Sequence, residues 1–271
     1  MKRPVLCLVI GMASPMIPTA ASGQDMINNL PDYTGAWVMG DLMQRRGRDF
    51  DKDEGKNRKT PNRPRDNRAS LEKQATYTPS PAVKSKVNEA FASYLGGNPP
   101  ASGPTLLRAL AADSPPRSAF TRLLAAGQGS GEDAIRSALQ RGQLQRDYAG
   151  WLASMGYSER NLFDVNTAFL MHSWSIANNG ITVRYPKIAF GAVRDDLVKQ
   201  QDPARLASRD NARKQEEAQS FALFTALLVS AWQDADAQER AVLRDGVAAL
   251  GRRIGVDYTR VELSSEGFQS R

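Results

Sequence analysis

His172 is the only histidine among the 271 residues, so acid–base catalysis or metal binding by imidazole would have to use this one side chain. It lies on an apolar stripe of the helix expected over 162–178, which favours a packed, hydrogen-bonded core histidine. Asp164 is eight residues earlier, too distant along one helix to orient the ring. Glu216 or Glu217 on another helix could do so, which leaves a hydrolase-like use of His172 with carboxylates as an alternative.

The acidic run Asp49–Glu54 resembles the start of a calcium-binding loop, in which acidic ligands alternate along the chain. The pattern then fails, because the glycine comes one residue late and Thr60 occupies the position of the closing glutamate. Basic residues in and after the run would also repel a cation. We therefore expect no metal ion here.

The other reactive side chains do not form a recognisable catalytic set. Asp195–Asp196 and Glu216–Glu217 are adjacent pairs, and neighbours on a helix point in different directions. Arg213 and Glu217 have the spacing of a helical ion pair. The glycine-rich run 127–131 lacks the lysine of a phosphate-binding loop. The sequence assigns no catalytic, cofactor-binding or metal-binding residue and no cofactor, and it favours a non-enzymatic role over an enzymatic one.

Residues 1–23 have the pattern of a secretory signal peptide. A basic start at Lys2 and Arg3 precedes the apolar run Val5–Met12, and small residues lead to an expected cleavage site near Ser22–Gly23. The apolar run is shorter than the roughly 20 residues that a transmembrane helix needs. Cys7, the only cysteine, would leave with the signal. We expect a secreted or periplasmic protein with no transmembrane segment in its mature chain.

Composition divides the rest of the chain into three segments. Residues 24–44 are mixed, and their Tyr33 and Trp37 could either dock on a partner or fold back onto the chain. Residues 45–73 hold eleven Lys or Arg against six Asp or Glu and few large apolar side chains, which predicts a disordered basic linker. Such a linker could bind an anionic polymer weakly, although the composition suits a solvated spacer better.

Residues 74–271 predict an all-α domain, an irregular bundle of helices. One helix begins at Ser80–Pro81 and ends at Gly96–Gly97. Further helices are expected over 106–112, 117–126, 132–155, 162–178, 187–200, 209–235 and 238–251, with candidate breaks at Gly142 and Gly150. The segments 162–178 and 221–232 are apolar on most of their circumference, which is typical of central core helices. The tail after Gly255 predicts one short strand or an extended cap.

The aromatic residues Trp151, Tyr157, Trp174 and Trp232 fall at helical spacings or helix ends. Core packing is the expected role, and a ligand groove between helices is the alternative.

Three stretches of this domain carry a resemblance to a known group of proteins. They are Tyr77–Val83 with Phe91, Met155–Leu162 leading into 168–178, and Gly255–Asp257 followed by Gly267–Phe268. Together they frame residues 77–268, over which the chain resembles a family of uncharacterised bacterial secreted proteins, catalogued as a domain of unknown function. The resemblance implies secretion and a helical fold, and it carries over no catalytic residue.

These observations predict a secreted or periplasmic helical module that acts by contact with a protein or cell-envelope partner. Two alternatives stay open. One is binding of an anionic polymer through residues 45–73, and the other is an enzyme with a cleft between helices that uses His172 and carboxylates.

Overall fold

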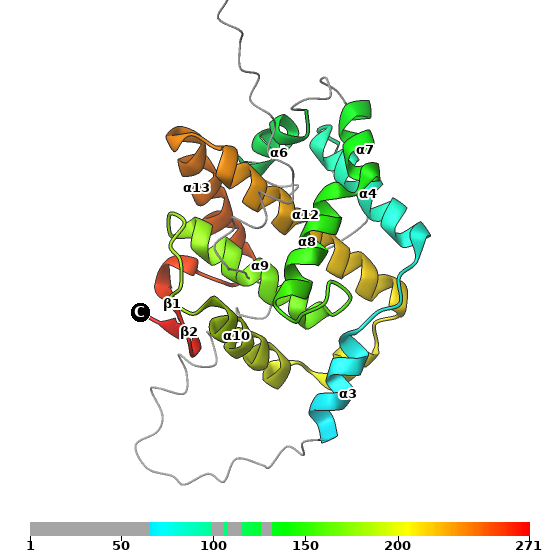
Figure 1. Cartoon of the computed structure of the whole chain (residues 1–271), viewed down its shortest axis with the longest axis vertical. Coiled ribbons are helices and arrows are strands. Elements are labelled where there is room, and N and C mark those ends of the chain that lie inside the picture. Colours follow the sequence, from blue (N-terminus) through cyan, green and yellow to red (C-terminus); the bar gives the residue numbers. More distant parts are fainter. Residues whose placement is uncertain (1–65, 99–105, 108–114, 126–131) are drawn as a thin grey trace, which may run out of the picture.

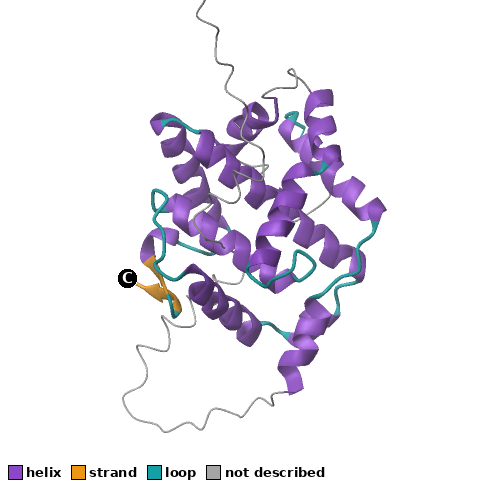
Figure 2. Cartoon of the chain, viewed as in Figure 1, coloured by secondary structure: helices purple, strands orange, loops and turns teal. Residues whose placement is uncertain are grey.

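The structure, a computed structural model, describes residues 66–98, 106–107, 115–125 and 132–271. Within these ranges the protein is an all-α bundle with a small strand pair at its C-terminal end, which confirms the predicted fold class (Figures 1 and 2). The signal segment, residues 24–44, the acidic run 49–54 and the glycine-rich run 127–131 lie outside the described residues.

The helices follow the sequence pattern closely, with bounds α3 Asp66–Ala75, α4 Pro81–Leu95, α6 Pro115–Ala125, α7 Glu132–Arg141, α8 Gln143–Ser154, α9 Leu162–Ala177, α10 Pro186–Gln200, α11 Pro203–Ala207, α12 Asn211–Asp234 and α13 Ala237–Arg253. A 3₁₀ turn, Tyr258–Arg260, precedes strands β1 Val261–Ser264 and β2 Gly267–Ser270. The helix expected over 209–235 is the single helix α12, which begins after Asp210 because the Asp210 carboxylate accepts a hydrogen bond from the Arg213 N–H. The short α11 before it was not expected.

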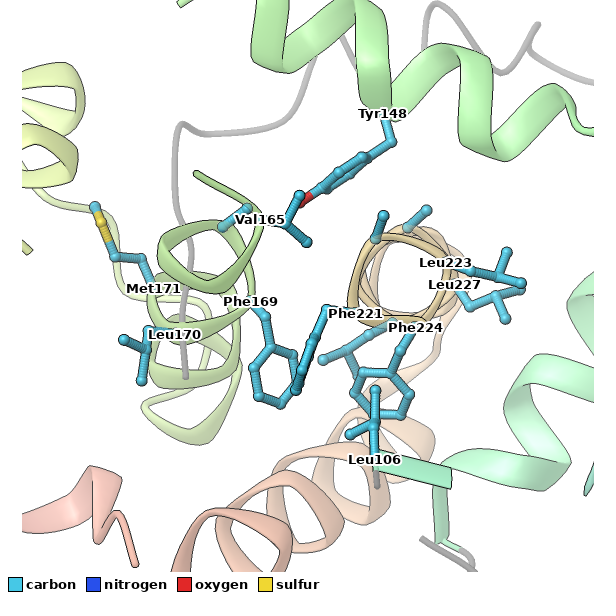
Figure 3. Packing of buried hydrophobic residues seen from close by; sticks show 14 of the residues in the cluster. Leu106, Tyr148, Val165, Phe169, Leu170, Met171, Phe221, Leu223, Phe224 and Leu227 are labelled. Atoms are coloured by element: carbon cyan, nitrogen blue, oxygen red, sulfur yellow. The ribbon is translucent and has the colours of Figure 1, made fainter. Parts of the chain in front are cut away.

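The core lies around α9 and α12. Every residue of α9 is buried, and so is each residue of α12 from Phe221 to Ala231. Figure 3 shows Phe169 of α9 against Phe221 and Phe224 of α12, with ring centroids 5.0 and 5.6 Å apart. Helices that are apolar all round must be enclosed by others, so the remaining helices cover this pair.

The structure corrects the predicted linker at its C-terminal end. Residues 66–73, assigned to the disordered segment 45–73, belong to α3. Leu71 is buried in the core, Ala75 is also buried, and Glu72 binds Arg194 of α10. One leucine and one ion pair give this charged helix a place on the bundle that its composition alone does not reveal. Residues 45–65 lie outside the described part.

A break in the helix expected over 132–155 occurs at Gly142 and not at Gly150. Gly142 has φ +65°, the left-handed region that favours glycine, and it separates α7 from α8. A Cβ at this position would lie 3.3 Å from the Lys84 Nζ of α4. Glycine therefore both turns the chain here and leaves room for a neighbouring ammonium group.

The C-terminal tail forms two antiparallel strands, where one strand or an extended cap was predicted. The Trp174 indole N–H of α9 donates to the Val261 carbonyl oxygen at 3.0 Å, and Phe268 packs edge-on against the same indole. Trp174 thereby ties the strand pair to the core. Among the described residues, none of the helices is both long enough and apolar enough to span a bilayer.

Candidate functional site

His172 is sealed inside the bundle. Its side chain is 3% exposed, its ring lies 5.3 Å from that of Trp151, and burial lowers its pKa from 6.5 to about 3. The adjacent cavity of about 10 Å³ is far below the several hundred Å³ of ordinary ligand sites. A neutral, enclosed imidazole with no space for a substrate matches the packed core histidine that the sequence favoured.

The carboxylates suggested as partners for His172 bind cations instead. Glu216 accepts a hydrogen bond from the Lys86 ammonium at 2.8 Å. Glu217 accepts one from Arg209 at 2.7 Å, so its closest partner is not the predicted Arg213. The described residues that line the cavity beside His172 include no carboxylate.

Asp164 belongs to a separate charged group, which we call the Arg194 cluster and which consists of Glu72, Asp164 and Arg194. Arg194 donates from Nε to Asp164 at 2.5 Å and from both terminal nitrogens to the two Glu72 oxygens, also at 2.5 Å. Asp164 also accepts from the Ser158 N–H at 2.7 Å. Burial raises the pKa of Asp164, and Arg194 and the Ser158 N–H oppose that rise.

The Arg194 cluster joins three helices, because Glu72 is on α3, Asp164 on α9 and Arg194 on α10. The Arg194 side chain is 12% exposed and lies 5.9 Å from the centre of the Tyr157 ring. Its donors are committed to carboxylates, so the cluster is suited to hold helices together and has little capacity left for a ligand.

Two adjoining pockets offer more accessible chemistry. The first, of about 180 Å³, is lined by Tyr77, Pro79, Lys84, Val87, Asn88, Gln145, Glu159, Arg160, Gln219 and Ala222. The second, of about 260 Å³, is lined by Pro81, Lys84, Ser85, Asn88, Glu89, Arg136 and Gln140. They share Lys84 and Asn88, and together they form what we call the polar groove. Figure 1 shows α4, α7 and α8, which supply much of its lining, on one side of the molecule.

Hydrogen bonds fix the middle of the polar groove. The Asn88 amide of α4 donates to the Leu139 carbonyl oxygen of α7 at 3.1 Å. The Asn88 oxygen accepts from the Gln145 amide of α8, also at 3.1 Å. Gly142 lies between α7 and α8, where the Lys84 ammonium approaches it. The break at Gly142 therefore places Gln145 and Lys84 on the same wall.

The charges of the polar groove are less tightly paired than those of the Arg194 cluster. Burial raises the pKa of Glu159, while the charges of Arg160 and Lys84 lower it. Within the described ranges, none of these three side chains makes a hydrogen bond or a close ion pair with another residue. At the far end, Arg136 is committed to Glu89 through two hydrogen bonds of 3.0 and 3.1 Å.

A row of amides on α12 leads into the polar groove. Asn211 accepts from the Thr78 N–H and donates to the Thr78 carbonyl, at 2.7 and 2.8 Å. Gln215 makes the same pair of bonds with Ser80, both at 2.8 Å. Gln219, one turn further along, lines the groove beside Tyr77. Two successive amides thus hold an extended stretch of the chain's own backbone.

The sequence analysis did not identify the polar groove. Its available signal was the spacing of four between Asn211, Gln215 and Gln219, which places three amides on one face of a helix. The four aromatic positions behave mainly as core residues. Trp151 and Trp174 are buried, Tyr157 stacks on Phe190, and Trp232 is half-buried beneath Arg240.

No group of three His, Cys, Asp or Glu side chains in the described part of the chain is arranged to hold a metal ion. No family model, no curated protein and no solved structure matches this chain. The resemblance to uncharacterised bacterial secreted proteins therefore stays a prediction.

Proposed function

We propose that this protein is a secreted or periplasmic helical module that acts by binding, and that the polar groove receives an extended polypeptide segment of a protein partner. The proposal keeps the contact-based role expected from the sequence and assigns it to a place on the bundle. His172 has no part in it.

The observation that carries the proposal is the way α12 holds residues 78–80. An amide side chain presents N–H donors and a carbonyl acceptor, so one amide can satisfy both the N–H and the carbonyl group of a backbone residue. Asn211 and Gln215 do this for Thr78 and Ser80. Where this extended stretch ends at the start of α4, the groove begins, and Asn88, Gln145 and Gln219 line it.

Charge supports a partner segment that carries an acidic side chain. Lys84 and Arg160 line the first pocket together with one half-buried carboxylate, Glu159. The carboxylate of the second pocket, Glu89, is paired with Arg136. Because Lys84 and Arg160 form no close ion pair within the described residues, they can attract a carboxylate from a partner segment.

The test is site-specific photo-crosslinking in the native host. A photoreactive residue at Ser85, an exposed position that lines the groove, is expected to give a discrete adduct with one partner protein. The same residue at Val242, which is 45% exposed on α13, serves as the matched control. The Ser85 adduct should disappear when Gln145→Ala and Arg160→Glu are introduced together.

Two results would count against the proposal. Identical adducts from Ser85 and Val242 would show that the partner is crosslinked non-specifically, without binding at the groove. A Ser85 adduct that survives Gln145→Ala with Arg160→Glu would show that the groove chemistry does not select the partner.

A further inference from the structure

Exposed large apolar side chains gather in one short segment between α9 and α10. Among the described residues, four large apolar side chains are strongly exposed, and three of them are Ile181, Tyr185 and Ile188, at 49, 51 and 59%. The fourth is Val242 on α13, at 45%. Isolated exposed apolar residues are ordinary, but three within eight positions call for a reason.

The segment is anchored at both ends, so its exposure is a property of the fold. Asn179 has φ 61°, and its side-chain oxygen accepts a hydrogen bond from Arg244 of α13 at 3.2 Å. Gly180, with φ +74°, packs so closely on Trp232 that a Cβ would lie 3.1 Å from the indole nitrogen. Val183 packs against the core and Pro186 begins α10.

The charge of the segment has one sign. Residues 179–188 include two cations, Arg184 and Lys187, and no acidic residue. Both cations are exposed, and the Arg184 guanidinium lies 5.4 Å from the centre of the Tyr185 ring. The first carboxylate along α10 is Asp195, which is already bound to Arg68 of α3. No carboxylate on the segment itself therefore offsets its two cations.

We propose that residues 181–188 form a contact surface for an anionic phospholipid bilayer. Each part of the segment suits that surface. Isoleucine side chains gain by entering the acyl boundary, and a tyrosine ring favours the headgroup level. Lysine and arginine beside them pair with lipid phosphates and respond to the negative surface potential. A protein groove or a second copy would also accept the isoleucines, but neither would require that both charged residues of 179–188 be cations.

The contact is shallow and does not involve a membrane span. Three apolar side chains and two cations give weak, reversible association, which a second attachment of the same chain would strengthen. The surface is separate from the polar groove, so the two proposals stand or fall independently.

The experiment places an environment-sensitive dye on the segment in the full chain. In a Cys7→Ser background, a single cysteine replaces either Ile188 or, as the matched control, Val242. Each labelled protein is titrated with vesicles of phosphatidylglycerol or of phosphatidylcholine. We expect a blue shift for the dye at position 188 with phosphatidylglycerol, and a much smaller one with phosphatidylcholine or at position 242. Arg184→Ser with Lys187→Ser should weaken vesicle binding about tenfold, because each cation near such a surface adds to the attraction.

A second measurement avoids the dye. Flotation of the unlabelled full chain with phosphatidylglycerol vesicles should fall for Ile181→Ser, Tyr185→Ser and Ile188→Ser combined, and not for Val242→Ser. Equal shifts at positions 188 and 242, or unchanged flotation of the triple variant, would overturn the proposal. A blue shift that appears without vesicles and grows with protein concentration would also overturn it, and would assign the surface to a second copy of the chain.

Discussion

The Arg194 cluster and the polar groove contain the same kinds of side chain and use them in opposite ways. In the cluster, a cation on α10 is bound at 2.5 Å by carboxylates from α3 and α9, and the arginine and aspartate are almost fully buried. In the groove, the charges of Arg160 and Lys84 lower the pKa of Glu159, but neither side chain forms a close pair with it. The charges of the Arg194 cluster join three helices, whereas those of the polar groove are available at the surface.

This difference in charge pairing shows which charged side chains of a helical bundle can bind a ligand. A buried charge without a partner is costly, so the fold supplies a partner for each one that it encloses. A half-exposed charge keeps its water and needs no partner, so it can remain open to a ligand. Composition alone does not distinguish the two cases, because both regions draw on Arg, Lys, Asp and Glu.

The largest expected effect comes from breaking the Arg194 cluster. Arg194→Met removes the cation and leaves Asp164 buried without its counter-charge, which should lower the free energy of unfolding by about 3–5 kcal/mol. Lys84→Met in the groove is the matched control, and it should change that free energy by less than about 0.5 kcal/mol. Guanidinium chloride unfolding at neutral pH measures both. Equal losses for the two variants would remove the distinction between the regions.

The next largest effect is the pH dependence of stability that comes from His172, which is buried like the Arg194 cluster. Its pKa is about 3 in the folded protein against 6.5 ordinarily, so between these pH values the unfolded chain binds more protons. Stability is therefore complete above pH 6.5 and falls as the pH is lowered towards 3. By pH 4.5 the loss from this one group should be about 2–3 kcal/mol. His172→Gln lacks a titrating group and should lose correspondingly less between pH 7 and pH 4.5 in urea unfolding.

Carboxylates also titrate in that pH range, but they do so in both proteins, so their contribution cancels in the comparison. An identical pH dependence for His172→Gln and the parent protein would mean that His172 is accessible to protons in the folded state. The hydrolase-like alternative would then regain support.

Much of this fold could be predicted from sequence, because its helices have strong local signals. Ser80–Pro81 and Gly96–Gly97 bracket α4 as expected, and the apolar circumference of 162–178 correctly identified a central helix. The failures come from long-range contacts. The composition of α3 predicts a linker, and the contact that attaches this helix to the bundle is between Glu72 and Arg194, which are 122 positions apart. The polar groove joins residues from Tyr77 to Ala222, and the helical spacing of Gln219 with Asn211 and Gln215 does not show which distant residues lie beside it.

A third experiment compares how much Asn88 and Gln145, two side chains that line the groove, contribute to the free energy of unfolding. Asn88 is buried, and Asn88→Ala removes two hydrogen bonds, one to the Leu139 carbonyl and one from the Gln145 amide. The Leu139 carbonyl keeps its bond from the Gly142 N–H, so the expected cost is about 1–2 kcal/mol of unfolding free energy. Gln145→Ala removes only the bond to the Asn88 oxygen and should cost less, about 0.5–1 kcal/mol. Thermal and chemical unfolding of the two variants measure the difference. A larger cost for Gln145 would place it among the structural groups and weaken its assignment to a partner.

The smallest effect gives the finest comparison, because it contrasts two glutamates whose pKa is raised by burial. Glu217 is hydrogen-bonded to Arg209, whereas Glu159 in the groove has no such bond within the described residues. A raised pKa means that the folded state favours the protonated acid, so the benefit is present at low pH and is lost as the pH rises through the range above 4.5. At pH 7, Glu159→Gln should therefore be neutral or stabilising, and any gain should shrink as the pH falls and Glu159 becomes protonated in both states. Glu217→Gln should destabilise at pH 7, because it weakens the bond to Arg209. If both variants destabilise alike, Glu159 has a structural partner, and the groove is not the open, underpaired site that the comparison with the Arg194 cluster requires.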